Sequence, residues 1–237
     1  MNSQKEHKLD LTAAVRILNN AGKPDPRELS DDPDVQLQTI IDSLCDLSVH
    51  DGLTGLVNAT FFHAVLSREI ERSLRTGRTC GLMVIDIDHF KLINDTYGHN
   101  IGDKALQAVA KQMKCSMRSM DTAARIGGEE FAIILPECSP EDAIQAAKRI
   151  HSTLNPLIVS VENIALQLTT SCGLVWTYPN RSLSSLMLVA EADQEMYRAK
   201  RSGRGRLCYR SLDTTMVSKE ERSALMILSL EEQSHDR

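Results

Sequence analysis

The sequence predicts an α+β fold in which helices cross one face of a mixed sheet of about five strands, in the style of a ferredoxin-like plait. The first observation is a pair of apolar runs of strand length, at residues 81–86 and 131–135, the second of which ends at Pro136. The second observation is that amphipathic helical stretches separate such runs. The expected order is helix, strand, helices, hairpin, helix, strands, helix and strand.

The composition is typical of a soluble globular protein. The 237 residues are 42% hydrophobic and 25% charged, which suits one domain of ordinary size with flanking segments. The net charge of −5 argues against broad binding to nucleic acid or to an anionic membrane, so an anionic substrate needs local Lys and Arg side chains. No apolar stretch approaches the ~18 residues of a membrane span, and the polar N-terminus lacks a signal-peptide core.

The six cysteines are scattered singly along the chain, without a C-x-x-C pair. Most of them stand in apolar contexts, namely Cys45, Cys80, Cys115 and Cys172. This pattern favours reduced cysteines in the core of a cytoplasmic protein over disulfides or a zinc site.

The N-terminal residues predict helices of uncertain purpose. Residues 9–19 fit a short helix, after which segments 22–26 and 30–33 break the chain. Residues 34–49 carry apolar side chains at the spacing of an a/d seam: Leu37, Ile40, Leu44 and Leu47. Two heptads are too few for a stable coiled coil alone, so this helix either packs on its own domain or forms a dimer stalk.

The next helix begins after the glycine-broken stretch 51–58, at the candidate N-cap Asn58. It closes at Gly77 and presents an apolar residue every four positions, at Phe62, Leu66, Ile70 and Leu74. After the strand at residues 81–86, residues 90–98 predict a short helical turn and loop. Residues 102–120 predict a longer helix.

A hairpin is centred on residues 127–131, which read GGEEF. The two glycines separate a short strand at 123–126 from the apolar run, and predict a tight turn that uses φ > 0. Glu129 and Glu130 follow, and side-chain alternation predicts that they point in different directions. Taken alone, these residues are equally typical of a solvated acidic turn.

In the C-terminal third, predicted helices and strands again alternate along the chain. Ser139 as N-cap and Pro140 at the first helical position open a helix that runs to about residue 154. Residues 164–170 and 173–177 predict a second pair of strands.

A helix over residues 183–201 and a closing strand over residues 206–209 complete the predicted domain. Beyond residue 211, a capping-box pattern at residues 218–221 leads into an apolar run and predicts a C-terminal helix.

Two of the apolar strands end in carboxylates. Asp86 and Asp88 close the first strand, and Glu129 and Glu130 stand beside the second. Isolated acids at a buried edge are costly to desolvate, and a hard cation offsets that cost. Because Mg²⁺ is held by one or two carboxylates plus phosphate oxygens, these acids predict a magnesium site.

With these residues in view, the chain resembles the GGDEF family of bacterial diguanylate cyclases. The resemblance covers residues 51 to 208 and is carried by GGEEF at 127–131, DIDHFK at 86–91, NDTYGHNIGD at 94–103 and DGLTGLVN at 51–58. It implies the family's palm-like fold, akin to nucleotide cyclases. It also implies an N-terminal extension with a helical stalk at 1–50, a catalytic domain at 51–210, and a tail at 211–237.

The family's reaction joins two GTP molecules into cyclic di-GMP and releases two pyrophosphates, so the resemblance implies a nucleotidyltransferase that works as a homodimer of facing domains. It implies that Asp86, the carbonyl of Ile87 and Glu129 hold Mg²⁺ or Mn²⁺. Glu130 is implied near the attacking hydroxyl, but spacing leaves open which glutamate accepts the proton. Lys91 is implied to stabilise phosphate charge, and Asp88 is expected as an N-cap.

The resemblance also implies the substrate contacts. Asn94 and Asp103 would read guanine, because a carboxylate accepts from both N1–H and the exocyclic amino group, which adenine cannot match. Phe90 would line the nucleotide site, as would His99, for which a solvated loop position is the alternative. Asp103 can equally be a first-turn helix acid.

Two groups of basic residues have a functional and an ordinary interpretation. Lys200 and Arg204 would grip the β- and γ-phosphates, or simply favour the helix C-terminus. Arg118, Asp121 and Arg149 resemble the family's inhibitory site for cyclic di-GMP, or form an ordinary surface pair at a helix end.

Rival functions are a catalytically silent module that binds GTP or cyclic di-GMP, and an unrelated Mg²⁺-dependent nucleotidyl cyclase. Loss of the acids or of the Lys/Arg pair would indicate the silent module, and none of them is lost. The unrelated cyclase would recognise its base through residues other than Asn94 and Asp103.

Overall fold

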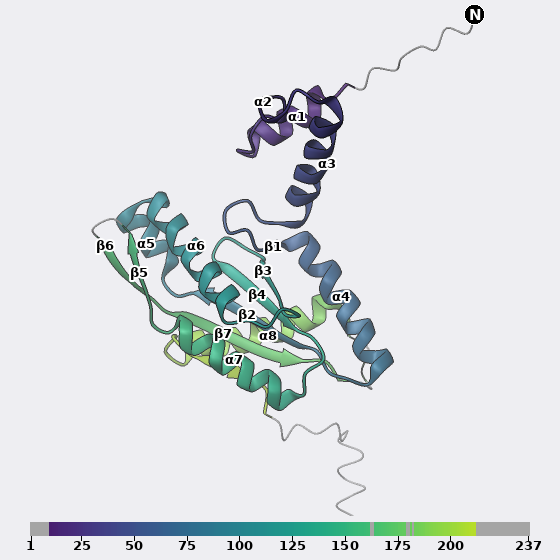
Figure 1. The fold of residues 1–237 in the computed structure, drawn as a ribbon. Coiled ribbons are helices and arrows are strands. Elements are labelled where there is room, and N and C mark those ends of the chain that lie inside the picture. The colour runs from purple at the N-terminus through teal and green to yellow at the C-terminus, as the bar shows by residue number, and fades with distance from the viewer. Residues whose placement is uncertain (1–9, 162–163, 179–180, 182, 212–237) are drawn as a thin grey trace, which may run out of the picture.

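The structure is a computed structural model that describes residues 10–161, 164–178, 181 and 183–211. A six-stranded sheet with strand order β1-β3-β4-β2-β7-β8 forms its centre, and β5 and β6 form a separate two-stranded sheet (Figure 1). The strands of the central sheet are β1 (Val57–Asn58), β2 (Gly81–Ile87), β3 (Thr122–Arg125), β4 (Glu130–Leu135), β7 (Thr170–Trp176) and β8 (Leu207–Tyr209). The edge strand β8 matches the closing strand predicted at residues 206–209, whereas the short edge strand β1 was not predicted.

The helices of the sheet domain are α4 (Ala59–Thr76), α5 (Phe90–Tyr97), α6 (His99–Cys115), α7 (Pro140–Leu154) and α8 (Ser185–Arg201). Their ends follow local signals in the sequence. Asn58 caps α4 by accepting from the backbone N–H of Phe61, and Gly77 ends it at φ 70°. Ser139 and Asp142 form a capping box at α7.

The expected mixed sheet flanked by helices is confirmed, but helices cover both of its faces rather than one. All seven residues of β2 are buried, and so are all seven of β7. Because successive side chains of a strand point to opposite faces, such strands must be covered on both sides. Helices α6 and α7 pack on one face, and α4 and α8 pack on the other.

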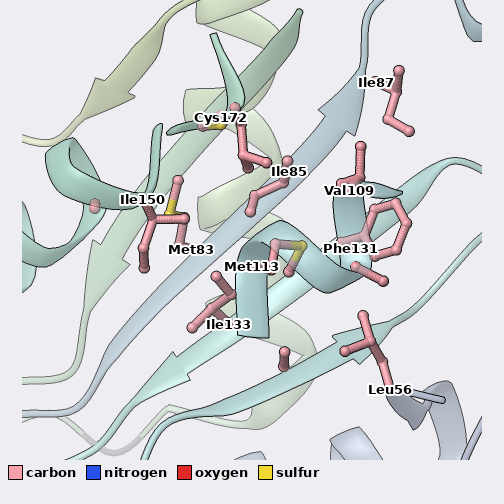
Figure 2. Close-up of a cluster of buried hydrophobic side chains, with 14 of the residues drawn as sticks. Leu56, Met83, Ile85, Ile87, Val109, Met113, Phe131, Ile133, Ile150 and Cys172 are labelled. Atoms are coloured by element: carbon pink, nitrogen blue, oxygen red, sulfur yellow. The ribbon is translucent and has the colours of Figure 1, made fainter. Parts of the chain in front are cut away.

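The core beneath α6 and α7 is the larger of the two. Figure 2 shows part of it, in which Met113 of α6 lies close to Met83 and Ile133 of the sheet. On the opposite face, α8 approaches the sheet closely at Gly173. A Cβ at that position would stand 2.1 Å from the carbonyl oxygen of Ala192, so only glycine admits this helix–strand contact.

The predicted pairing of residues 164–170 with 173–177 is wrong. Strand β6 (Ile164–Leu168) pairs instead with β5 (Leu157–Val161), a strand that the sequence analysis did not include. Strand β7 pairs with β2 in the central sheet. The reason is burial: β5 and β6 alternate along their length, as in a strand with one exposed face, whereas β7 is buried throughout.

The N-terminal helices α1 (Thr12–Asn20), α2 (Pro26–Leu29) and α3 (Pro33–Val49) gather at one end of the molecule (Figure 1). The seam of α3 packs against α1: buried Ile40, with Leu44 and Leu47 beside it, meets Val15 and Leu18. This contact supports packing of the helix on its own chain for part of the seam, while Leu37 lies outside the cluster and the dimer-stalk alternative stays a prediction.

Two of the cysteines expected in the core are not there. Cys80 and Cys172 are buried, whereas Cys45 and Cys115 are exposed near the surfaces of α3 and α6. All six cysteines are free thiols in this structure.

Within the described residues, no helix combines the length and the apolar character needed to cross a bilayer. The predicted C-terminal helix lies outside the described residues.

Candidate active site

The acids of β2 and of the β3–β4 turn come together at one end of the central strands. Strand β2 runs antiparallel to β4, with Asp86 opposite Glu130. Beyond this pair, the backbone N–H of Ile87 donates to the carbonyl oxygen of Glu129 over 3.3 Å. Directly opposite residues of an antiparallel pair project to the same face, so the register places both carboxylate-bearing strand ends at one edge.

The GGEEF turn does not use the backbone conformation that the sequence analysis expected. Positive φ occurs at several described residues, but neither Gly127 nor Gly128 is among them. What a side chain at position 127 would meet is the flexible carboxylate of Glu130. A Cβ there would stand 2.4 Å from Oε2 of Glu130, whose side chain folds back over the turn.

Arg125 links the GGEEF turn to the stretch 51–58 at the start of the sheet domain. The guanidinium of Arg125 donates to the carbonyl oxygen of Gly128 over 2.8 Å. The same group lies 3.3 Å from the carboxylate of Asp51, which accepts from the backbone N–H and hydroxyl of Thr54. Sequence reasoning missed Arg125 and Asp51 as supports of the turn, because the two residues are far apart in the chain.

Lys200 completes the group of charges. Its Nζ lies 2.8 Å from Oδ2 of Asp86, which is 5% exposed. Lys200 stands in the last turn of α8, and Arg204 follows in the loop after the helix. The positive charges of both residues act on Asp86.

Burial dominates the electrostatics of the two acids. It raises the pKa of Asp86, and the Lys200 ammonium and the Arg204 guanidinium offset part of the rise. Burial also raises the pKa of Glu129, as does the nearby negative charge of Asp86, while Lys200 acts in the opposite direction. Asp86, Glu129, Lys200 and Arg204 therefore belong to one electrostatic cluster.

The cluster fits a cation that arrives with a nucleotide. Among the described residues, no group of three or more His, Cys, Asp or Glu side chains is arranged to hold a metal ion. Mg²⁺ in nucleotide sites needs only one or two carboxylates, because phosphate oxygens and water supply the rest. Asp86 and Glu129 are close enough for the charge of Asp86 to raise the pKa of Glu129, and together they provide the two carboxylates.

Asp88 is not the helix cap that the sequence analysis expected. The N-cap of α5 is His89, in a left-handed conformation at φ 58° and without a side-chain capping bond. Asp88 turns away and is buried at 5% exposure. Its carboxylate accepts three hydrogen bonds instead. The donors are Ser171 of β7, Thr169 just before β7, and Gly205 in the loop after α8.

The residues expected to read guanine lie where α5 meets α6. The carboxamide Oδ1 of Asn94 is buried without a hydrogen-bond partner. A Cβ on Gly102 would come within 1.9 Å of that oxygen. Gly102 thus leaves room for an acceptor that has no partner in the protein, which is what a ligand-binding group requires.

The remaining expected nucleotide contacts lie on the same two helices, α5 and α6. The ring of Phe90 is buried beside Gly102, at 3.3 Å from the Cβ position. Asp103 and His99 are exposed in the first turns of α6, and Lys91 is exposed on α5. Helix α6 begins at His99 rather than at the expected residue 102, so this whole group is carried on helices.

The three expected inhibitory-site residues lie within electrostatic reach of one another, with Asp121 between the two arginines' charges. Asp121 accepts from the backbone N–H of Arg118 over 2.8 Å. Burial raises the pKa of Asp121, and the charges of Arg118 and Arg149 offset part of this. Arg118 and Asp121 line a pocket of about 340 Å³. In the described part of the chain, Asp121 accepts from the backbone of Arg118 and forms no ion pair with its guanidinium.

Comparison with known proteins gives a consistent result. The family described as Diguanylate cyclase, GGDEF domain matches residues 48–206. Probable diguanylate cyclase DgcC of Escherichia coli (strain K12) is 38% identical over 161 residues, which cover 68% of this chain and 43% of DgcC. Response regulator PleD of Caulobacter vibrioides (strain NA1000 / CB15N) is 36% identical over 191 residues, covering 76% of this chain and 42% of PleD. The chain spans less than half the length of these relatives.

Solved structures agree. The coiled coil and GGDEF domain of DgcB from Caulobacter crescentus, in complex with c-di-GMP, matches with a TM-score of 0.69 and 27% identity, over 85% of this chain and 100% of that one. Diguanylate cyclase SiaD from Pseudomonas aeruginosa, in complex with its activator SiaC, matches with a TM-score of 0.66 and 33% identity, over 84% and 74%.

Proposed function

Because the chain belongs to the diguanylate cyclase GGDEF-domain family, we propose that it condenses two GTP molecules into cyclic di-GMP and releases two pyrophosphates. In this reaction the 3′-hydroxyl of one GTP attacks the α-phosphorus of the other, the bond to pyrophosphate breaks, and the step is repeated in the opposite sense. The protein has to position the two nucleotides, neutralise phosphate charge and accept the hydroxyl proton.

One observation carries the proposal: Lys200 pairs with Asp86 at 2.8 Å, in a cluster that also includes Glu129 and Arg204. The net charge of −5 gives the chain no general attraction for anions. A local group with two basic side chains and two acids suits a triphosphate bound together with a divalent cation.

Mg²⁺ or Mn²⁺ bound to the nucleotide would supply a Lewis acid that neutralises charge on the phosphates. Asp86, Glu129 and the backbone carbonyl of Ile87 would hold it. Lys200 would exchange its ion pair with Asp86 for the β- and γ-phosphates, and Arg204 would grip the same phosphates with its planar guanidinium. Lys91, exposed on α5, would stabilise charge on the phosphates as well.

Glu129 and Glu130 are the two groups able to accept the proton of the attacking hydroxyl. Burial and the charge of Asp86 raise the pKa of Glu129, which brings this carboxylate closer to the range of an effective base. Glu130 lies against Gly127, with its side chain over the turn.

Guanine would bind between α5 and α6. The buried, unpartnered Oδ1 of Asn94 supports this location, because a purine amino group or N1–H would satisfy it. Asp103 would accept from both guanine donors and leave adenine unfavourable. Phe90 and His99 would line the same pocket.

Each domain would hold one GTP, so catalysis requires a homodimer with facing domains. Arg118, Asp121 and Arg149 would bind the product and restrain turnover, which is a feedback role separate from catalysis. The pocket beside Arg118 and the electrostatic contact of Arg149 with Asp121 support this second site.

The proposal is tested by incubating the purified chain with GTP and Mg²⁺ and identifying products by mass spectrometry. Cyclic di-GMP and pyrophosphate are expected, with no product from ATP and none from the Glu129→Gln/Glu130→Gln double variant. GTP binding without product would identify a silent binding module instead. A different cyclised nucleotide would identify an unrelated cyclase, and either outcome would overturn the proposal.

A further inference from the structure

The buried carboxylate of Asp88 joins three parts of the chain. Its Oδ1 accepts from the hydroxyl of Ser171 over 2.7 Å. Its Oδ2 accepts from the hydroxyl of Thr169 and from the backbone N–H of Gly205, each over 2.9 Å. In addition, the backbone N–H of Asp88 donates to the carbonyl oxygen of Thr169 over 2.9 Å.

These contacts leave Asp88 poorly suited to a role as a metal ligand. A buried carboxylate needs compensation for lost hydration, and three protein donors provide it here. A metal ion at Asp88 would compete with donors that already occupy both oxygens. The neighbouring acid Asp86 differs, because its partner is the mobile ammonium group of Lys200.

The loop held by Asp88 has an unusual backbone. Gly203, Arg204 and Gly205 have φ values of 111°, 60° and 56°, so three consecutive residues adopt positive φ. For Arg204, which has a Cβ, this conformation is unfavourable and persists only when neighbouring contacts enforce it.

Contacts on both sides enforce the loop. On the N-terminal side, the backbone N–H of Arg204 itself donates to the carbonyl oxygen of Ala199 in α8 over 3.1 Å. On the C-terminal side of Arg204, the N–H of Gly205 donates to Asp88, and the carbonyl oxygen of Arg206 accepts from the N–H of Cys172 over 2.9 Å. The guanidinium of Arg206 also donates to the carbonyl oxygen of Arg204 over 3.1 Å. The carboxylate of Asp88 is the anchor that comes from the strand end carrying Asp86.

We infer that Asp88 is a positioning residue: it fixes the loop after α8 to the end of β2, and so aims Arg204 at the phosphates that Asp86 and Lys200 face. The inference rests on the proposed function for the identity of the ligand. It gives the second acid of the DIDHFK segment a geometric task, distinct from the charge that Asp86 supplies.

The test compares Asp88→Ala with Asp88→Asn. Alanine removes every acceptor, whereas asparagine keeps one oxygen for the N–H of Gly205, and the Ser171 hydroxyl can rotate to accept from its amide. We expect Asp88→Ala to raise the KM for GTP on the order of tenfold. Asp88→Asn should recover most of the wild-type KM, and kcat should change less than KM in both.

A double-mutant cycle with Arg204→Ala links the effect to the guanidinium. Once Arg204 is absent, Asp88→Ala should raise KM little further, because the two residues act in series. Asp142→Ala is the matched control, since Asp142 also accepts from a serine, Ser139, but at the remote start of α7. Melting temperatures of all variants establish that they are folded.

Hydrogen exchange at the Gly205 amide gives a readout that does not depend on turnover. Exchange should accelerate in Asp88→Ala and remain slow in Asp88→Asn and Asp142→Ala. If the wild type binds GTP without converting it, the proposed function fails, and GTP affinity from calorimetry replaces KM in the same comparison.

Three results would overturn the inference. The first is an unchanged KM or GTP affinity in folded Asp88→Ala. The second is an equal defect in Asp88→Asn and Asp88→Ala, because charge rather than geometry would then matter. The third is a higher Mg²⁺ requirement at saturating GTP, which would make Asp88 a metal ligand.

Discussion

Asp86 and Lys200 form an ion pair of 2.8 Å that joins the end of the central strand β2 to the last turn of α8. The two residues are brought together by the close approach of α8 to β7, which Gly173 permits. Because Asp86 is buried, its charged form depends on this partner, and the pair places a basic group beside the acid before any nucleotide is bound.

Replacing Lys200 by methionine should therefore destabilise the protein in a pH-dependent manner. Burial already raises the pKa of Asp86, and loss of Lys200 raises it further. A carboxyl group with a raised folded-state pKa destabilises the fold once the pH exceeds that pKa, so the stability loss should be present near neutral pH and disappear in acid. Urea unfolding at pH about 7 and about 4 measures it.

Lys111→Met is the matched control for that comparison, because Lys111 is an exposed lysine on α6. Its stability should be close to wild type at both pH values. Equal destabilisation of Lys200→Met at both pH values would show that the lysine stem, rather than its charge, matters to the fold.

Glu129→Gln should lose activity and gain stability. The pKa of Glu129 lies above its ordinary value of 4.5, because of burial and then of the charge of Asp86. The wild type thus loses stability as pH rises through the folded pKa of Glu129, and the neutral amide does not. The melting temperature of the variant should exceed that of the wild type near neutral pH, and the difference should shrink in acid.

Turnover of GTP by Glu129→Gln should fall by roughly a hundredfold or more, as for loss of a group acting on the reacting atoms. Glu141→Gln, at an exposed first-turn position of α7, controls for the removal of one negative charge. A Glu129→Gln variant that is less stable at neutral pH would contradict the electrostatic picture of the cluster.

Local patterns in the sequence were sufficient to predict most of the helices and the two central strands. Gly77 and Ser139 end and begin their helices as expected, because capping depends on neighbouring residues. The acids of β2 and of the GGEEF turn were predicted to meet, because each group borders a strongly apolar run, and the structure brings Asp86 and Glu129 within electrostatic reach.

Features that depend on distant residues were not predictable in this way. The side-chain donors to Asp88 lie 81 and 83 positions along the chain, and Gly205 lies 117 positions away, so local capping was the only role available to sequence reasoning. Gly127 was assigned to backbone conformation, whereas in the structure its φ is not positive and a Cβ there would meet the Glu130 carboxylate. Strand β5 was missed because its short alternating pattern is weak without its partner β6.

Gly102→Ala should weaken recognition of guanine through Asn94. The added Cβ would stand 1.9 Å from Oδ1 of Asn94, so the carboxamide must move away from its present position. We expect KM for GTP to rise on the order of tenfold while the fold is retained, because the main displacement is of the Asn94 amide and the Phe90 ring, at 3.3 Å, needs to move only slightly. Steady-state kinetics and a melting curve measure the two quantities.

Gly52→Ala provides the control for the glycine change, since nothing lies within 4 Å of the Cβ position there. Its KM should match the wild type. If Gly102→Ala also leaves KM unchanged, then the position of the Asn94 amide does not contribute to substrate binding.

Arg118→Ala should relieve product inhibition without changing the initial rate. Arg118 is exposed beside the pocket that it shares with Asp121, and Arg149 is the second guanidinium near that carboxylate. Removing one of two phosphate-binding groups should raise the concentration of cyclic di-GMP that halves the rate by about tenfold or more. Initial rates at increasing product concentrations measure this shift, with Arg75→Ala, at the exposed end of α4, as the control. An inhibition curve that is the same for Arg118→Ala, Arg75→Ala and wild type would place feedback at another surface, or exclude it.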